Sequence, residues 1–176
     1  MGYLRKQLSE RIHKGAIDEI CLTMDDDKCK AELWALLFDG DKRTSDNAAW
    51  VFSHFSVIQR VWLNDKQNEL MDEIMRTESI TKRRLMLSLI ESQSFEEKNI
   101  RTDFLDFCLS QLSDPEIPSG IRALCIKMAH KQCRHYSELL KELQVQLEYL
   151  QPTELQPGLR HTRNSIMRKI AEELRA

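Results

Sequence analysis

The sequence predicts an all-α protein built from repeated helical hairpins, and three observations carry that prediction. Apolar residues recur at intervals of three and four along most of the chain, which is the spacing of one face of an α-helix. No stretch shows the alternation of apolar and polar residues that a half-buried strand requires. The apolar residues that end successive first helices are separated by 37, 38 and 38 residues; they are Leu37, Ile74, Leu112 and Leu150. A constant period near that value, with two helices per unit, indicates an α-solenoid of about four to five hairpins.

The first 27 residues are expected to cap this array with two short helices, at 3–12 and 16–24. Asp25, Asp26 and Asp27 interrupt the apolar pattern. They supply carboxylates to the next helix, because the N-terminal end of a helix dipole favours negative charge. Within a single domain of residues 1–176, the cap is followed by hairpin units at 28–60, 61–98, 99–135 and 136–176.

Each unit is expected to contain two helices. The pairs are 28–38 with 45–58, 64–76 with 79–90, 105–112 with 119–132, and 136–150 with 159–174. The third pair shows the pattern most clearly. Its first helix ends near Leu112, because the following Ser-Asp-Pro contains a proline that cannot continue a helix. Pro118 and Ser119 then open the second helix, since both residues favour a helix start.

The Ser-Asp-Pro-Glu turn at 113–116 and the Ile-Arg-Ala-Leu that begins the next helix resemble the HEAT repeat family, within the armadillo-like superfamily. In that family an Asp or Asn ends the first helix and an Arg lies near the start of the second. Asp114 and Arg122 occupy these two places. The resemblance covers about residues 28–176, and it implies a right-handed α-α superhelix that acts as a binding or scaffold module.

A charged side chain on the apolar side of a helix needs a partner, because an unpaired buried charge is costly. Arg122 and Arg163 lie on or at the edge of the apolar sides of their helices, and an Asp on the preceding turn is the expected partner. The residues interpreted as structural in this way are Asp39, Arg83, Asp114, Arg122 and Arg163.

Basic side chains gather on the expected second helices. Residues 118–135 contain four basic residues and no acidic one, and residues 158–170 show the same counts. Because second helices usually line the concave side of a solenoid, this face could be a positive groove for an acidic peptide or a nucleic-acid backbone. The alternative is an ordinary solvated face. The candidate contacts are Arg84, Lys127, His130, Lys131, Arg134, His161, Arg168 and Lys169.

Trp50 is a further candidate contact. Its helix buries Phe52 and Phe55, and Trp50 projects to nearly the opposite side, beside His54. An exposed tryptophan is a common anchor of protein interfaces. In the alternative, the N-terminal helix pair covers it.

Charge and composition narrow the functional classes. The net charge is −2 and the isoelectric point is about 6.2, so the overall charge does not indicate a nucleic-acid binder. Five cysteines form no CxxC pair, which favours a reducing, cytoplasmic location. The N-terminus lacks the apolar core of a signal peptide, and no apolar run is long enough to span a bilayer.

No motif predicts catalysis, a cofactor or a metal site. His130, Cys133 and His135 do not share one helix face and lack the second ligand pair of zinc sites. The loop that starts at Asp39 fails the EF-hand pattern, since Trp50 stands at its twelfth position. We therefore expect a non-enzymatic module that binds a protein partner, with a homodimer through one end of the solenoid as a further option. The alternative is a nucleic-acid-binding protein similar to the HEAT-like DNA glycosylases for alkylated bases.

Overall fold

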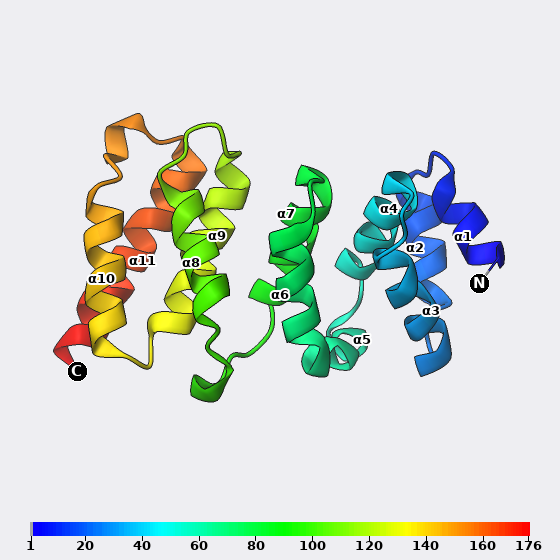
Figure 1. Ribbon diagram of the computed structural model, residues 1–176, viewed down its shortest axis with the longest axis horizontal. Coiled ribbons are helices and arrows are strands. Elements are labelled where there is room, and N and C mark those ends of the chain that lie inside the picture. The colour runs from blue at the N-terminus through cyan, green and yellow to red at the C-terminus, as the bar shows by residue number, and fades with distance from the viewer. Residues whose placement is uncertain (1) are drawn as a thin grey trace. The chain divides into compact units, whose positions relative to one another are not determined.

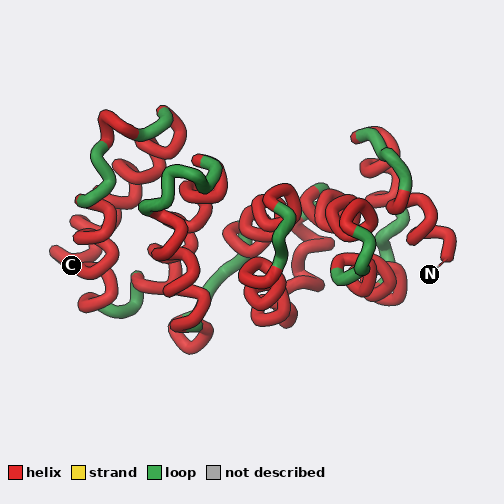
Figure 2. Tube along the Cα trace, turned by 45° about the horizontal axis from the view of Figure 1, so that its top comes forward, coloured by secondary structure: helices red, strands yellow, loops and turns green. Residues whose placement is uncertain are grey.

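The computed structural model describes residues 2–176, except for the side chain of Asn99. Over this range the chain consists of helices and connecting segments, with no strand, as the colours of Figure 2 show. The predicted all-α fold class is therefore confirmed. The chain divides into two compact units, Met1–Ile90 and Glu91–Ala176.

The first unit begins with two short helices that both pack on the same later helix, α4. Its elements in chain order are α1 (Gly2–Ser9), α2 (Lys14–Leu22), α3 (Asp27–Leu37), α4 (Lys42–Ser53), α5 (Val57–Arg60), a 3-10 helix (Val61–Lys66), α6 (Gln67–Arg76) and α7 (Ile80–Glu91), whose last residue, Glu91, is the first of the second unit. Helix α3 pairs with α4, and Figure 1 draws this group in blue and cyan. The fully buried side chains of the unit include Leu33, Phe52 and Met71.

Side-chain caps fix the starts of several of these helices. Asp26 accepts a hydrogen bond from the backbone N–H of Cys29 at 2.7 Å, which confirms the expected role of the aspartates before α3. The expected helix at 45–58 is instead two helices, α4 and α5. It is broken because Ser56 starts a new helix through a capping box with Gln59.

The second unit contains four α-helices, arranged as two hairpins, α8–α9 and α10–α11. Its elements are a 3-10 turn (Glu97–Asn99), α8 (Thr102–Leu112), α9 (Ser119–Cys133), α10 (Ser137–Glu148), a 3-10 turn (Pro152–Glu154) and α11 (Pro157–Arg175). Helix α9 packs against α8, α10 and α11, and α10 packs against α11 (Figure 1). The two second helices, α9 and α11, therefore lie side by side, as the repeat pattern predicts.

Within residues 2–176, Arg122 and Arg163 bind backbone carbonyls and not aspartates, which corrects the sequence-based expectation for these two arginines. Arg122 donates to the carbonyl oxygen of Leu112 from Nε at 2.9 Å and from Nη2 at 2.6 Å. Asp114 instead accepts from the backbone N–H of Glu116 at 2.9 Å, within its own turn. The last carbonyls of a helix lack partners within the helix, so a buried cation satisfies them and benefits from the dipole.

The same arrangement recurs in neighbouring hairpins. Arg83 donates to the carbonyl of Ile74 at 2.9 Å and also to that of Thr77. Arg163 donates to the carbonyl of Leu147 at 3.0 Å. In each case a second-helix arginine binds the carboxyl end of the first helix of its own hairpin.

The first hairpin uses a different cation for the same purpose. The carbonyl of Leu37 accepts from Ser45 Oγ at 2.6 Å and from Lys82 Nζ at 2.5 Å. Lys82 also binds the carboxylate of Glu73, and both side chains are buried, with residue exposures of 4% and 5%. This network joins the α3–α4 hairpin to the α6–α7 hairpin.

Asp39 is structural, but its partner lies on α1. Its carboxylate accepts hydrogen bonds from Nε of Arg5 at 2.7 Å and from Nη2 of Arg5 at 3.1 Å. It also accepts one from the backbone N–H of Asp41. These bonds to the charged form lower the pKa of Asp39, with the Arg5 guanidinium as the largest cause.

Candidate functional site

Helices α9 and α11 bring five of the predicted contact residues to one place. On α9 these are Lys127, His130 and Lys131, which are spaced so that they share one face. On α11 they are His161 and Lys169, two turns apart on one face. Because the two helices pack against each other, these faces border a common hollow of about 310 Å³.

The floor of this hollow is formed by side chains that are already paired or apolar. His130 is only 6% exposed, and its Nε2 lies 2.8 Å from the carboxylate of Glu173. Ile166 is buried beside it on α11. His130, predicted from the sequence as a partner contact, is thus buried and already bonded within the chain.

The walls and rim carry the available donors. Lys127 is half-buried and Lys169 is exposed, and neither has an ion pair or hydrogen bond within residues 2–176. The hydroxyls of Thr162 and Ser165 also line the hollow, half-buried and likewise without a hydrogen-bond partner in that range. The one carboxylate among the lining residues belongs to Glu91. Positive charge and hydrogen-bond donors thus predominate.

Lys131 has a structural role that the sequence did not reveal. Its Nζ donates to the backbone carbonyls of Glu91 and Gln93, the latter at 3.0 Å. Burial lowers the pKa of Lys131, and the positive charges of Lys127, Arg134 and Lys169 lower it further, while Glu91 opposes the shift. The lysines of the hollow are therefore close enough to repel one another.

The remaining predicted contacts lie outside the hollow. Arg134 and Arg168 are exposed on α9's C-terminal cap and on α11. Arg84 is exposed on α7, in the first unit. Trp50 is half-buried on α4, with its ring centroid 6.3 Å from that of His54. The structure therefore brings some of the candidates together and leaves others apart.

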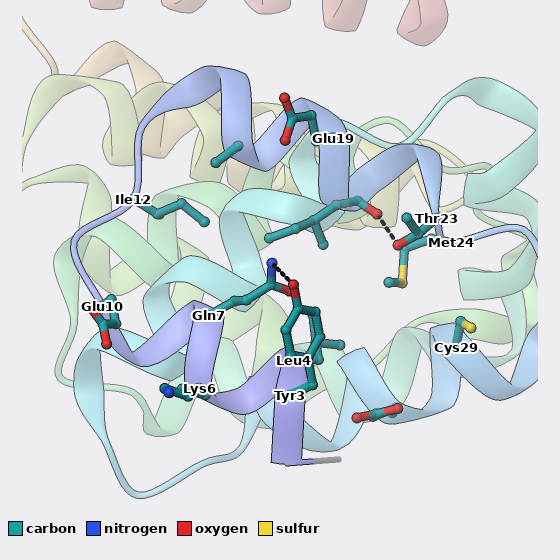
Figure 3. A pocket seen from close by; sticks show the side chains of 13 residues that line it. Tyr3, Leu4, Lys6, Gln7, Glu10, Ile12, Glu19, Thr23, Met24 and Cys29 are labelled. Atoms are coloured by element: carbon teal, nitrogen blue, oxygen red, sulfur yellow. Dashed lines mark hydrogen bonds between the residues drawn. The ribbon is translucent and has the colours of Figure 1, made fainter.

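The first unit contains a larger and more apolar cavity, shown in Figure 3. It has a volume of about 850 Å³ and lies between α1, α2 and α3. Leu4, Ile20 and Met24 are the buried apolar residues that line it. Tyr3 is 78% exposed, and its hydroxyl lies 3.4 Å from Gln7 Nε2 (Figure 3). Such a cavity can accept apolar side chains.

Most charged side chains around this cavity are negative, whereas most of those around the hollow between α9 and α11 are positive. Glu10, Glu19 and Glu32 line it together with a single lysine, Lys6. The sequence pattern did not predict this cavity, because the N-terminal helices were expected only to cap the array. The apolar residues on both short helices could have indicated the cavity. Two amphipathic helices can leave such a space between them where they diverge.

Two observations concern metal ligation and thiol reactivity in the described residues. Within residues 2–176 there is no group of three or more His, Cys, Asp or Glu side chains that could hold a metal ion. Cys108 and Cys133 are buried in the second unit, and burial raises both thiol pKa values, that of Cys133 to about 12. A thiol that stays protonated is a poor nucleophile. The helices of the same range include none with the length and apolar character needed to cross a membrane.

The chain matches a known protein family. A family model described as a HEAT repeat domain matches residues 4–170. No curated protein and no solved structure matches the chain significantly. The match covers the two N-terminal helices as well as the later hairpins.

Proposed function

Because the chain belongs to the HEAT repeat family, whose members generally mediate protein interactions, we propose that it is a binding module for an acidic segment of a protein partner. The contact surface in this proposal is the hollow between α9 and α11. The observation that carries it is the set of lysines around this hollow, of which Lys127 and Lys169 have no acidic partner within residues 2–176.

Two physical arguments support this surface. Positive side chains in a concavity attract an acidic segment and increase its rate of association. The floor is also held in place by His130 and Lys131, whose partners are Glu173 and the backbone near Glu91. A rigid floor with unpaired donors above it loses little conformational entropy on binding.

The test compares two charge-reversal variants with the same change in net charge. Lys127→Glu with Lys169→Glu alters the hollow, whereas Lys141→Glu with Arg175→Glu alters exposed cations on α10 and α11 outside it. The binding partner in the assay is a short fluorescent peptide rich in Glu. The first variant should weaken its binding by about tenfold or more, because attraction becomes repulsion, and the second should change it little.

Neither variant removes a buried contact, so both should retain the helical circular dichroism of the parent. Equal binding by all three proteins would refute the proposed surface. Tight binding of a short DNA duplex, with a steep loss of affinity between about 50 and 200 mM salt, would favour the nucleic-acid alternative instead.

A further inference from the structure

We propose that the hollow between α9 and α11 receives a phosphoryl group, carried by a phosphorylated side chain of the partner. This inference rests on the proposed function and specifies the chemical group that the site selects. It goes beyond a general preference for acidic segments, because a carboxylate and a phosphoryl group differ in charge and in the number of acceptor oxygens.

The unneutralised charge of the hollow favours the more highly charged ligand. Lys131 lies 4.0 Å from the carboxylate of Glu91, whereas Lys127 and Lys169 have no counter-ion within residues 2–176, so their two charges remain unneutralised. Clustered ammonium groups repel one another until an anion binds between them. A phosphomonoester carries about −1.5 to −2 at neutral pH, so it relieves more repulsion than the single charge of a Glu side chain.

The neutral donors of the hollow match the same ligand. Thr162 and Ser165 lie on the face of α11 that also carries His161 and Lys169, and neither hydroxyl has a hydrogen-bond partner within residues 2–176. A hydroxyl can donate one hydrogen bond. The three oxygens of a phosphoryl group can accept from Lys127 on one helix and from these hydroxyls on the other, whereas a carboxylate has only two oxygens.

The size and surroundings of the hollow favour a single phosphomonoester over a nucleic-acid backbone. A duplex distributes one charge on each of many phosphates and binds along an extended basic surface. Here the hollow measures about 310 Å³, with Glu91 among its lining residues and Glu173 bonded to His130 at its floor. The chain as a whole carries a net charge of −2.

The experiment uses the full chain and three peptides of identical acidic sequence that carry Ser, phosphoserine or Glu at one central position. Affinities are measured by fluorescence anisotropy. The phosphoserine peptide should bind about tenfold tighter than the Glu peptide, since charge-assisted hydrogen bonds to its extra oxygen and charge add to the attraction.

Two variants locate the effect. Lys127→Gln with Lys169→Gln should weaken the phosphoserine and Glu peptides together and remove most of the difference between them. Thr162→Val with Ser165→Ala should weaken binding of the phosphoserine peptide several-fold more than that of the Glu peptide, because the phosphoryl group has more acceptor oxygens for the hydroxyls. Lys141→Gln is the control outside the hollow.

The outcomes separate this inference from the proposed function. If the Glu and phosphoserine peptides bind equally well, and both depend on Lys127 and Lys169, the phosphoryl preference is wrong and the acidic-segment function stands. If neither peptide binds, both proposals are wrong. If inorganic phosphate displaces no peptide but a DNA duplex does so at nanomolar concentration, a nucleic-acid backbone is the ligand and the inference is overturned. A phosphoserine advantage that survives all the variants would place the site elsewhere, which also overturns it.

Discussion

The first unit contains an apolar cavity lined by three glutamates and one lysine, whereas the second contains a polar hollow lined by three lysines and one glutamate. Both units are nevertheless built from the same kind of helical hairpin, in which a polar side chain on or beyond the second helix binds the last carbonyls of the first. The difference shows that the hairpin framework and the chemistry of its open surfaces depend on separate sets of residues.

The units also differ in how their buried charges are balanced. In the first unit the buried Lys82 has a carboxylate partner, Glu73, which in turn binds Arg76. In the second unit the buried Arg122 binds a backbone carbonyl and has no carboxylate partner within residues 2–176. Removal of a partner should therefore harm the first unit more than the second. All three tryptophans, Trp34, Trp50 and Trp62, lie in the first unit, so tryptophan fluorescence reports on that unit separately.

The largest effect is expected from Glu73→Ala. It leaves Lys82 buried without its counter-ion, which costs about 3–5 kcal/mol. The free energy of unfolding measured by tryptophan fluorescence in urea should fall by this amount. The double variant Glu73→Leu with Lys82→Met should recover most of the loss, because no unpaired buried charge remains; Arg76, the other partner of Glu73, is exposed. An equal loss in the single and double variants would show that the ion pair is not the cause.

A smaller effect is expected from Arg122→Met. The variant removes two charge-assisted hydrogen bonds to the carbonyl of Leu112 and leaves that oxygen unsatisfied. The free energy of unfolding should therefore fall by about 1.5–3 kcal/mol in total. Arg163→Met should cost less, because Arg163 is more exposed and makes one bond to its carbonyl. The alkylation rates of Cys108, Cys125 and Cys133, read by mass spectrometry, report opening of the second unit. Equal rates in both variants would contradict this ranking.

Alkaline pH should destabilise the second unit through its buried thiols. The folded pKa of Cys133 is about 12, against an ordinary value of 9.0, so the folded state keeps a proton that the unfolded state loses. The stability from this thiol is complete below about pH 9 and is lost as the pH rises towards 12, by about 1.4 kcal/mol per pH unit. Unfolding measured in that window should have a shallower pH slope in Cys133→Ala. An unchanged slope would refute the assignment.

The smallest effect concerns the repulsion between lysines in the hollow. Lys127→Gln removes one of the positive charges that lower the pKa of Lys131, so that pKa should rise. The titration of the Lys131 side chain can be followed by NMR. Lys141→Gln, on the exposed side of α10, should leave it unchanged. If both variants gave the same shift, the effect would reflect total charge and not the proximity of Lys127.

Local sequence patterns predicted the helical hairpins well. They predicted less well the side-chain hydrogen bonds that hold each hairpin together. The hairpin at α8 and α9 followed from its apolar stripe, its Ser-Asp-Pro turn and the arginine at position 122. The sequence indicated which arginines are structural, but it gave the wrong acceptors. A backbone carbonyl has no sequence signature, so an acidic side chain nearby in sequence looked like the natural partner. The buried role of Lys82 was missed for the same reason, since its acceptor on Leu37 lies 45 residues away.

The sequence likewise predicted only part of the candidate site. The bias in charge on the second helices made Lys127 and Lys169 candidates, and the packing of α9 on α11 places them at one hollow. Helical spacing could not show that His130 is committed to Glu173, or that Thr162 and Ser165 face the same hollow. Those facts depend on how two helices approach each other, which a pattern within one helix does not contain.

The bond from Arg163 to the carbonyl of Leu147 spans 16 residues, compared with 9 and 10 for the equivalent bonds of Arg83 and Arg122. A hairpin secured in this way does not require a turn of fixed length, because the closing bond joins points on the two helices themselves. The proline-containing connection between α10 and α11 thus illustrates that the repeat accommodates extra residues at this position. A recognition peptide grafted there should be displayed at the surface without loosening the helices that carry it.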